Sequence, residues 1–223
     1  MRKFEYLILD LVILTSPFLG LVFYPRFIFP DLRRFLIATV FVSLFFVIWD
    51  NLVTGKWWRF NYRYLTGFKI FKLPIEEVSF FPIVSFSSLV IWLNLKDMLS
   101  LPVLPSFFPY SLAFLFLALV LFSFFKKRIY TFFVFLFELP VILFDLKFGA
   151  RIFFQASFYL FNLVVIILTF IFNYYLTSRP IVLYEEKYKS GFKVLTIPIE
   201  DFIYGLVFLD AIIVIYEFLL FIS

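Results

Sequence analysis

Two adjacent carboxylates recur at matched positions in this chain. Residues 67–77 read GFKIFKLPIEE, and residues 191–201, which lie 124 positions further on, read GFKVLTIPIED. The two segments are identical at six of eleven positions, and both run directly into an apolar stretch. The paired carboxylates are Glu76 with Glu77 and Glu200 with Asp201. Carboxyl groups at the edge of an apolar region can donate or accept a proton, so the motif points to duplicated acid–base chemistry.

Each motif also has the composition of a helix start. Proline is common at the first helical position, and carboxylates in the first turn are favoured by the helix dipole. One interpretation is therefore that the four carboxylates only cap two helices. Neighbouring helical residues point about 100° apart, so one member of each pair can face the interior while the other caps. We expect Glu76 and Glu200 to be the inward members.

Six further carboxylates lie within the apolar stretches or at their ends: Asp10, Asp50, Glu138, Asp145, Asp210 and Glu217. An ionisable group inside a membrane is a functional hypothesis by default, because its burial is costly. Asp10, Glu138 and Asp210 are the deepest of the six. A buried carboxyl without a cationic partner keeps its proton and can donate it to an apolar substrate. The other three lie near helix ends, where we expect structural hydrogen bonds.

Aromatic residues make up 25% of the chain. We expect most of them to face lipid or to fill the core. Trp57, Trp58, Tyr174 and Tyr175 are typical of the aromatic belt at a membrane surface. Rings that line a cavity near the carboxylates would stabilise a positive charge through their faces.

The composition indicates a polytopic membrane protein and excludes several kinds of site. Of the 223 residues, 64% are hydrophobic, whereas soluble domains have about 45–50% apolar residues. The chain has no Cys and no His, which excludes zinc sites, thiol catalysis and Ser-His-Asp triads. Its six glycines are too scattered for a nucleotide-binding loop. We expect no cofactor and no metal, and we attribute the net charge of +5 to membrane orientation rather than to nucleic acid.

The apolar stretches are long enough for seven membrane crossings. The sequence predicts spans at about 4–24, 34–50, 76–95, 107–125, 128–146, 154–176 and 200–221. The motif precedes the third span and recurs before the seventh. This spacing predicts an all-α membrane protein of two parallel three-helix repeats joined by a linking helix, a 3+1+3 plan. Its single membrane domain, 1–223, divides into a first repeat at 1–97, a linking helix at 98–126 and a second repeat at 127–223.

The distribution of basic residues predicts the orientation. With seven crossings, 14 Lys and Arg residues lie on the side of the N-terminus and six on the other. Positive loops stay in the cytoplasm. We therefore expect a multi-pass protein of the cell membrane with its N-terminus in the cytoplasm and its C-terminus outside.

These features together resemble the lycopene cyclase domain family. The resemblance rests on the duplicated PxE(E/D) motif, on the Asp-Asn…Trp-x-Phe pattern of DNLVTGKWWRF at residues 50–60, and on the parallel three-helix halves. It covers essentially the whole chain, as the fused form of the heterodimeric bacterial enzymes. The second loop departs from the first, since Arg179-Pro180 stands near the place of the tryptophans. Whether Asp50, Trp58 or Phe60 acts in catalysis or only in structure therefore stays open.

The resemblance implies a lycopene β-cyclase, an enzyme that closes the linear ends of lycopene to β-ionone rings without a redox change. It implies lycopene or a related linear carotenoid as substrate, the lipid bilayer as surroundings and other carotenoid-pathway enzymes as partners. By the same resemblance, Glu76 and Glu200 are the acid and base, and Glu77 and Asp201 support them or relay protons. Asp10, Glu138, Asp210, Asp50 and Trp58 are supporting candidates.

Other functions fit parts of the pattern. A cyclase that makes ε-rings or acts on C50 carotenoids would differ only in pocket shape and in the proton removed. A small proton-coupled transporter also has parallel repeats, but these spans have few polar residues to bind cargo. A retinal protein needs a lysine in the middle of its last helix, and residues 201–223 contain none.

Overall fold

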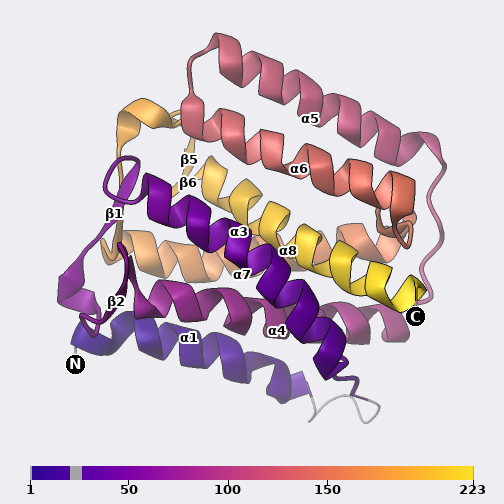
Figure 1. Cartoon of the computed structure of the whole chain (residues 1–223), viewed down its shortest axis with the longest axis horizontal. Helices are drawn as coiled ribbons and strands as arrows, with labels where there is room; N and C mark the ends of the chain where they lie inside the picture. The colour runs from indigo at the N-terminus through magenta and orange to yellow at the C-terminus, as the bar shows by residue number, and fades with distance from the viewer. Residues whose placement is uncertain (1, 21–26, 223) are drawn as a thin grey trace.

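The computed structural model describes residues 2–20 and 27–222, and its long helices run side by side in one bundle (Figure 1). The α-helices are α1 (Glu5–Thr15), α3 (Leu32–Val53), α4 (Ile75–Met98), α5 (Phe107–Phe125), α6 (Ile129–Phe148), α7 (Ala156–Ser178) and α8 (Ile199–Phe221). Among the described residues, all of these except α1 are long and apolar enough to cross a membrane. The chain is therefore an all-helical integral membrane protein.

The first predicted crossing differs from the other six. It begins as α1 and tightens into a 3-10 turn, η2 (Ser16–Leu19), at Pro17, which has no N–H for the helical ladder. Its 11 α-helical and four 3-10 residues extend about 25 Å, somewhat less than a hydrocarbon core of about 30 Å. Residues 21–24 of the predicted span lie outside the described residues. The seventh crossing, and with it the 3+1+3 plan, stays a prediction.

Helix α8 lies at the centre of the bundle and α5 lies at its edge. Half of the apolar stretch of α8 is buried, against 17% for α5. Helix α8 packs against α3, α4, α6 and α7, whereas α5 packs mainly along α6 (Figure 1). Helix α5 falls within residues 98–126, which were predicted to link the repeats. The N- and C-termini lie at opposite ends of the bundle (Figure 1).

Two loops at one end of the bundle have the same fold. Each forms one strand, a 3-10 turn and a short hairpin, and then enters a helix: β1 (Trp58–Phe60), η3 (Tyr62–Tyr64), β2 (Lys69–Ile70), β3 (Leu73–Pro74) and α4 in the first, β4 (Val182–Tyr184), η5 (Glu186–Tyr188), β5 (Lys193–Val194), β6 (Ile197–Pro198) and α8 in the second. Gly67 and Gly191 both have positive φ, 96° and 92°, a conformation that favours glycine. The glycine of the repeated motif is thus required by the turn that leads into each hairpin.

The two loops also pair with each other. Strands β1 and β4 are antiparallel, and Arg59 lies opposite Leu183, the residue 124 positions further on. Equivalent residues therefore meet at the centre of the pair, which gives it local two-fold symmetry. Side chains alternate across a strand, so Trp58 and Phe60 point into the protein and Arg59 points out.

Candidate active site

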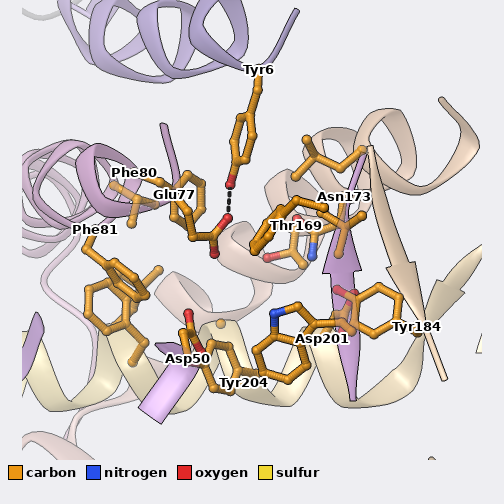
Figure 2. Close-up of a pocket in the computed structure, with 18 of the residues that line it drawn as sticks. Tyr6, Asp50, Glu77, Phe80, Phe81, Thr169, Asn173, Tyr184, Asp201 and Tyr204 are labelled. Carbon is orange, nitrogen blue, oxygen red and sulfur yellow. Dashed lines mark hydrogen bonds between the residues drawn. The ribbon is translucent and has the colours of Figure 1, made fainter. Parts of the chain in front are cut away.

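A cavity of about 120 Å³ lies where the first turns of α4 and α8 meet the β1–β4 strand pair (Figure 2). Its polar lining consists of Tyr6, Asp50, Glu77, Tyr130, Thr169, Asn173, Tyr184, Asp201 and Tyr204. Its aromatic lining adds Trp58, Phe60, Phe80, Phe81 and Phe208. Carboxyls, phenol hydroxyls and ring faces thus surround one small space.

Most of the cavity wall is made of residue pairs that are 124 positions apart. These pairs are Tyr6 with Tyr130, Trp58 with Val182, Phe60 with Tyr184, Glu77 with Asp201, Phe80 with Tyr204, Phe81 with Gly205, and Val84 with Phe208. The two halves of the chain therefore contribute equivalent surfaces to a single site. The second carboxylate of each motif faces this site, one from α4 and one from α8.

Glu76 and Glu200, the expected inward members of the two pairs, are both buried, but neither of them lines the cavity. Glu76 Oε1 accepts a hydrogen bond of 2.6 Å from the backbone N–H of Thr66. Glu200 Oε1 accepts an equivalent bond of 2.6 Å from the backbone N–H of Ser190. The first carboxylate of each motif thus fastens the preceding loop to the helix start. The 100° step along the helix then turns the side chains of Glu77 and Asp201 toward the cavity.

Tyrosine hydroxyls hold both inward carboxylates. Tyr6, from α1, donates a hydrogen bond of 2.6 Å to Glu77 Oε2 (Figure 2). Tyr130, from the equivalent turn of α6, donates a longer bond of 3.4 Å to Asp201 Oδ1. The shorter bond fixes the Glu77 carboxyl group more firmly, because 3.4 Å exceeds the usual O–H···O range of about 2.5–3.0 Å.

Asp50 adds a third carboxyl to the cavity, from the last turns of α3. Tyr204 donates a hydrogen bond of 2.6 Å to Asp50 Oδ1. The carboxyls of Asp50 and Glu77 are turned toward the same central space (Figure 2), and the two groups interact electrostatically. Two carboxylates that face one enclosed space repel each other when both are ionised, which favours a proton on one of them. Asp50, one of the supporting candidates, thus lines the cavity and also makes the kind of hydrogen bond expected near a helix end.

A buried lysine lies on the Asp201 side of the cavity. Lys189 is 2% exposed and occupies the position that matches Leu65 in the first loop. Its Nζ lies 5.2 Å from the ring centre of Tyr184 and 3.2 Å from Glu186 Oε1. Lys189 also attracts the Asp201 carboxylate. Burial and the adjacent Asp201 carboxylate hold the pKa of Tyr184 well above its usual range, so this hydroxyl stays protonated.

Of the three deepest carboxyls, one lies directly behind the cavity. Asp10 is fully buried on α1, and its Oδ2 accepts a hydrogen bond of 3.3 Å from the Ser79 hydroxyl, two residues beyond Glu77. Asp10 therefore belongs to the polar shell around Glu77 but does not line the cavity.

The other two deep carboxyls form a separate pair. Glu138 on α6 and Asp210 on α8 are both buried and interact electrostatically with each other. The Asn162 side-chain amide donates a hydrogen bond of 3.2 Å to Asp210 Oδ2. Neither carboxyl lines the cavity. Two buried carboxylates that lie near each other repel when both are ionised, which favours a proton on one of the two.

Asp145 and Glu217 hold the opposite end of the bundle together. Asp145 accepts backbone hydrogen bonds of 3.1 Å from both Ile152 and Phe153. Glu217 Oε1 accepts a bond of 2.6 Å from Trp92 Nε1 and lies 3.0 Å from Lys96 Nζ. Both carboxylates have the polar partners that burial demands.

Trp57 and Trp58 were both expected in the aromatic belt at the membrane surface, and the structure differs from this expectation for Trp58. Trp58 is not a surface anchor, because it is 5% exposed and its side chain lines the cavity. Its neighbour Trp57 packs against Trp49, with ring centroids 5.3 Å apart. Trp58 is the first residue of β1, whose alternation turns it inward, whereas Trp57 lies in the turn before that strand.

The site contains residues that the sequence reasoning missed. Tyr6 and Tyr130 were not singled out, although they stand 124 positions apart, at the same separation as the motif. A comparison of the two halves along their whole length, rather than at the motif alone, would have found them. No comparable signal marks Tyr204, whose counterpart in the first half is Phe80.

The fold and the site define a helical membrane protein with a cavity lined by carboxyl, hydroxyl and aromatic groups from two equivalent halves. A sequence model of the family described as lycopene cyclase matches residues 4–95 and 127–219, one match in each half. The chain belongs to the lycopene cyclase family, and the resemblance stated above is confirmed. Membership makes it a carotenoid cyclase in general terms. No curated protein and no solved structure matched the chain.

Proposed function

We propose that the protein is a lycopene β-cyclase that converts lycopene to γ-carotene and then to β-carotene by acid–base catalysis. The observation that carries this proposal is that Glu77 and Asp201 face a single aromatic cavity from two equivalent helices. One carboxyl can give a proton to the bound end of the substrate, and the other can remove one.

The reaction balances without an oxidant or a reductant. The carboxylic acid adds its proton to the terminal double bond and leaves a tertiary cation. The next suitably placed double bond attacks this cation, so that a carbon–carbon bond closes the ring and the positive charge moves to a ring carbon. A carboxylate then removes a proton from the adjacent carbon, and the ring double bond forms. One proton enters and one leaves, so the reaction is an isomerisation.

The aromatic wall has two tasks in this scheme. The ring faces of Trp58, Phe81 and Phe208 stabilise the cationic intermediates, because a ring face attracts a positive charge. The same rings exclude water, which would otherwise trap the cation as an alcohol.

We assign Glu77 as the proton donor and Asp201 as the base. Glu77 and Asp50 share one space, and repulsion between the two carboxylates favours one proton on this pair, which Glu77 can then deliver. Burial disfavours an ionised Asp201, but the nearby Lys189 charge and the hydrogen bond from Tyr130 counteract burial and favour the carboxylate that a base needs. Glu76 and Glu200 then have a positioning role, since their bonds to the loops set the angle of the helix starts.

The function is tested by expression in lycopene-accumulating cells with identification of the products by chromatography and mass. We expect γ-carotene followed by β-carotene. Products with ε-rings, or activity only on C50 carotenoids, would replace the β-cyclase proposal by a sister activity. Unchanged lycopene, with the protein present in the membrane, would contradict a carotenoid cyclase of this specificity altogether.

The assignment of acid and base is tested in D₂O. Each ring formed by the wild type should carry one deuterium from the donor. An Asp201→Asn variant should still exchange deuterium into the substrate or lose a different proton and give another ring isomer. A Glu77→Gln variant should do neither, and the reverse pattern would exchange the two roles.

We also propose the 3+1+3 arrangement, with 1–97 and 127–223 as parallel halves in the cell membrane and the N-terminus in the cytoplasm. The constant separation of 124 between equivalent cavity residues supports the two halves, and the 14-to-6 distribution of basic residues supports the orientation. Because the chain has no Cys, single cysteines in the loops can be labelled with a membrane-impermeant thiol reagent. Labelling of a cysteine placed at Lys187 from outside intact cells would contradict this topology.

A further inference from the structure

An open groove of about 540 Å³ runs along the side of the bundle between α3, α6 and α8. Every side chain that lines it is apolar. Leu44, on the α3 wall, is 58% exposed, and Ala211 lies on the α8 wall. The groove lies along the membrane-spanning parts of these helices, so it faces the hydrocarbon of the bilayer.

One layer of aromatic rings separates this groove from the acidic cavity. Phe46 lines the groove, is 3% exposed, and lies between the two spaces. Its ring centroid lies 5.2 Å from that of Tyr204 and 5.1 Å from that of Phe208, and both of these residues line the cavity. Phe46 is also one helical turn before Asp50 on α3, so the groove leads toward the carboxyls.

The matching place in the other half of the chain is narrower and carries more hydroxyl groups. A cleft of about 60 Å³ lies between α1, α4 and α7, at positions that match the groove. Thr169 stands there in place of Phe45, Ser16 in place of Pro140, and Ser87 in place of Ala211. The two sides of the cavity thus have matching backbones, but only one of them offers a wide apolar space.

We propose that the groove between α3, α6 and α8 binds the extended hydrocarbon chain of the substrate while its end reacts in the cavity. This inference rests on the proposed function. A cavity of about 120 Å³ cannot enclose a C40 polyene, so most of that molecule lies outside it during the reaction. The groove is a wide apolar space that the ring of Phe46 separates from the cavity, and a side-chain rotation of Phe46 would join the two.

The same geometry assigns the substrate one direction of approach. The reacting end passes Phe46 and meets Tyr204 and Asp50 first. The cleft on the other side shares Thr169 and Asn173 with the cavity, but at about 60 Å³ it is too narrow for the chain. After the first ring forms, the product must leave through the groove and return with its other end forward. A lipid acyl chain that merely fills the groove is the alternative occupant.

The test uses the absence of cysteine from the chain. An Ala211→Cys variant in lycopene-containing membranes is treated with benzyl methanethiosulfonate, an apolar reagent that attaches a ring through a disulfide. Turnover is measured before labelling, after labelling and after release with dithiothreitol, so each sample is its own reference. The matched control is Ala118→Cys, at an exposed position of α5 outside the groove. Intact mass confirms each modification.

We expect the label on Ala211→Cys to lower turnover at least tenfold and dithiothreitol to restore it, with no change for Ala118→Cys. Full turnover by the labelled Ala211→Cys variant would overturn the proposal and leave lipid as the occupant. If Ala211→Cys is inactive before labelling, Leu44→Cys on the opposite wall gives the same comparison. A wild type that leaves lycopene unchanged contradicts the proposed function, and the groove assignment fails with it.

Discussion

Glu76 and Glu77 are neighbours in sequence, and the structure predicts losses of turnover of very different size when each is changed to glutamine. Glutamine has nearly the shape of glutamate and keeps a carbonyl that accepts a hydrogen bond. In Glu77→Gln the bond from Tyr6 is therefore retained, but the group can no longer give up a proton. In Glu76→Gln the bond from the Thr66 N–H is retained, and no group that faces the cavity changes.

The expected magnitudes are far apart. General acid catalysis contributes about 100- to 10,000-fold, or about 3–5 kcal/mol, and Glu77→Gln should lose that amount. A hydrogen bond to a charged acceptor exceeds a neutral one by about 1 kcal/mol. If all of this loss in Glu76→Gln reached the transition state, turnover would fall about fivefold. The two variants should therefore differ by at least tenfold.

The assay is lycopene turnover in isolated membranes, normalised to the amount of folded protein in each preparation. The pair Glu200→Gln and Asp201→Asn repeats the comparison in the second half, where Ser190 has the place of Thr66. Equal losses in Glu76→Gln and Glu77→Gln would refute the reasoning from the cavity. They would indicate that the first carboxylate of each motif is also catalytic, or that the geometry of the loop controls the rate.

Further predictions concern stability and the opposite end of the bundle. The pKa of Tyr184 is raised in the folded protein, so the unfolded chain releases this proton at a lower pH. The free energy of unfolding should therefore fall as pH rises above about 10. Thermal unfolding should show a less steep fall for Tyr184→Phe. Gly67→Ala, at a φ of 96°, should lower the free energy of unfolding by about 1 kcal/mol or more, and Gly191→Ala should do the same; an unchanged melting temperature would contradict the required turn. Glu217→Leu leaves the Trp92 N–H without its acceptor and should cost about 1–3 kcal/mol, while turnover per folded molecule stays the same.

The sequence predicted most of the fold because its signals are long-range regularities. Six of the seven predicted spans correspond to helices of the described residues that are long enough to cross a membrane, since an apolar stretch of about 20 residues has few alternatives. The first span was less predictable, because Pro17 changes the local helix type without changing the apolar character. The short strands β1 and β4 were not predicted, and three residues are too few for a pattern of alternation.

The site was predictable in position but not in orientation. The motif and its duplication located the two helix starts, yet nothing in PIEE or PIED tells which carboxylate faces inward. That choice depends on how the preceding loop folds back, with the backbone N–H of Thr66 or Ser190 reaching the first glutamate. Trp58 shows the same limit, because a tryptophan beside basic residues suits a membrane surface until its strand partner is known.

The pairing of β1 with β4 has a consequence for how the protein is made. Strand β1 leaves the ribosome well before its partner β4, which follows 124 residues later and emerges after about 6–25 s at usual rates of synthesis. During that interval Trp58 and Phe60 have no strand beside them, and their edge is open to wrong partners or proteases. The loop cannot reach its final form until the second half has been inserted in the right direction. Formation of this strand pair therefore requires the chain through α7 to be in place, and the carboxyls of the cavity are brought together only after α8 has followed.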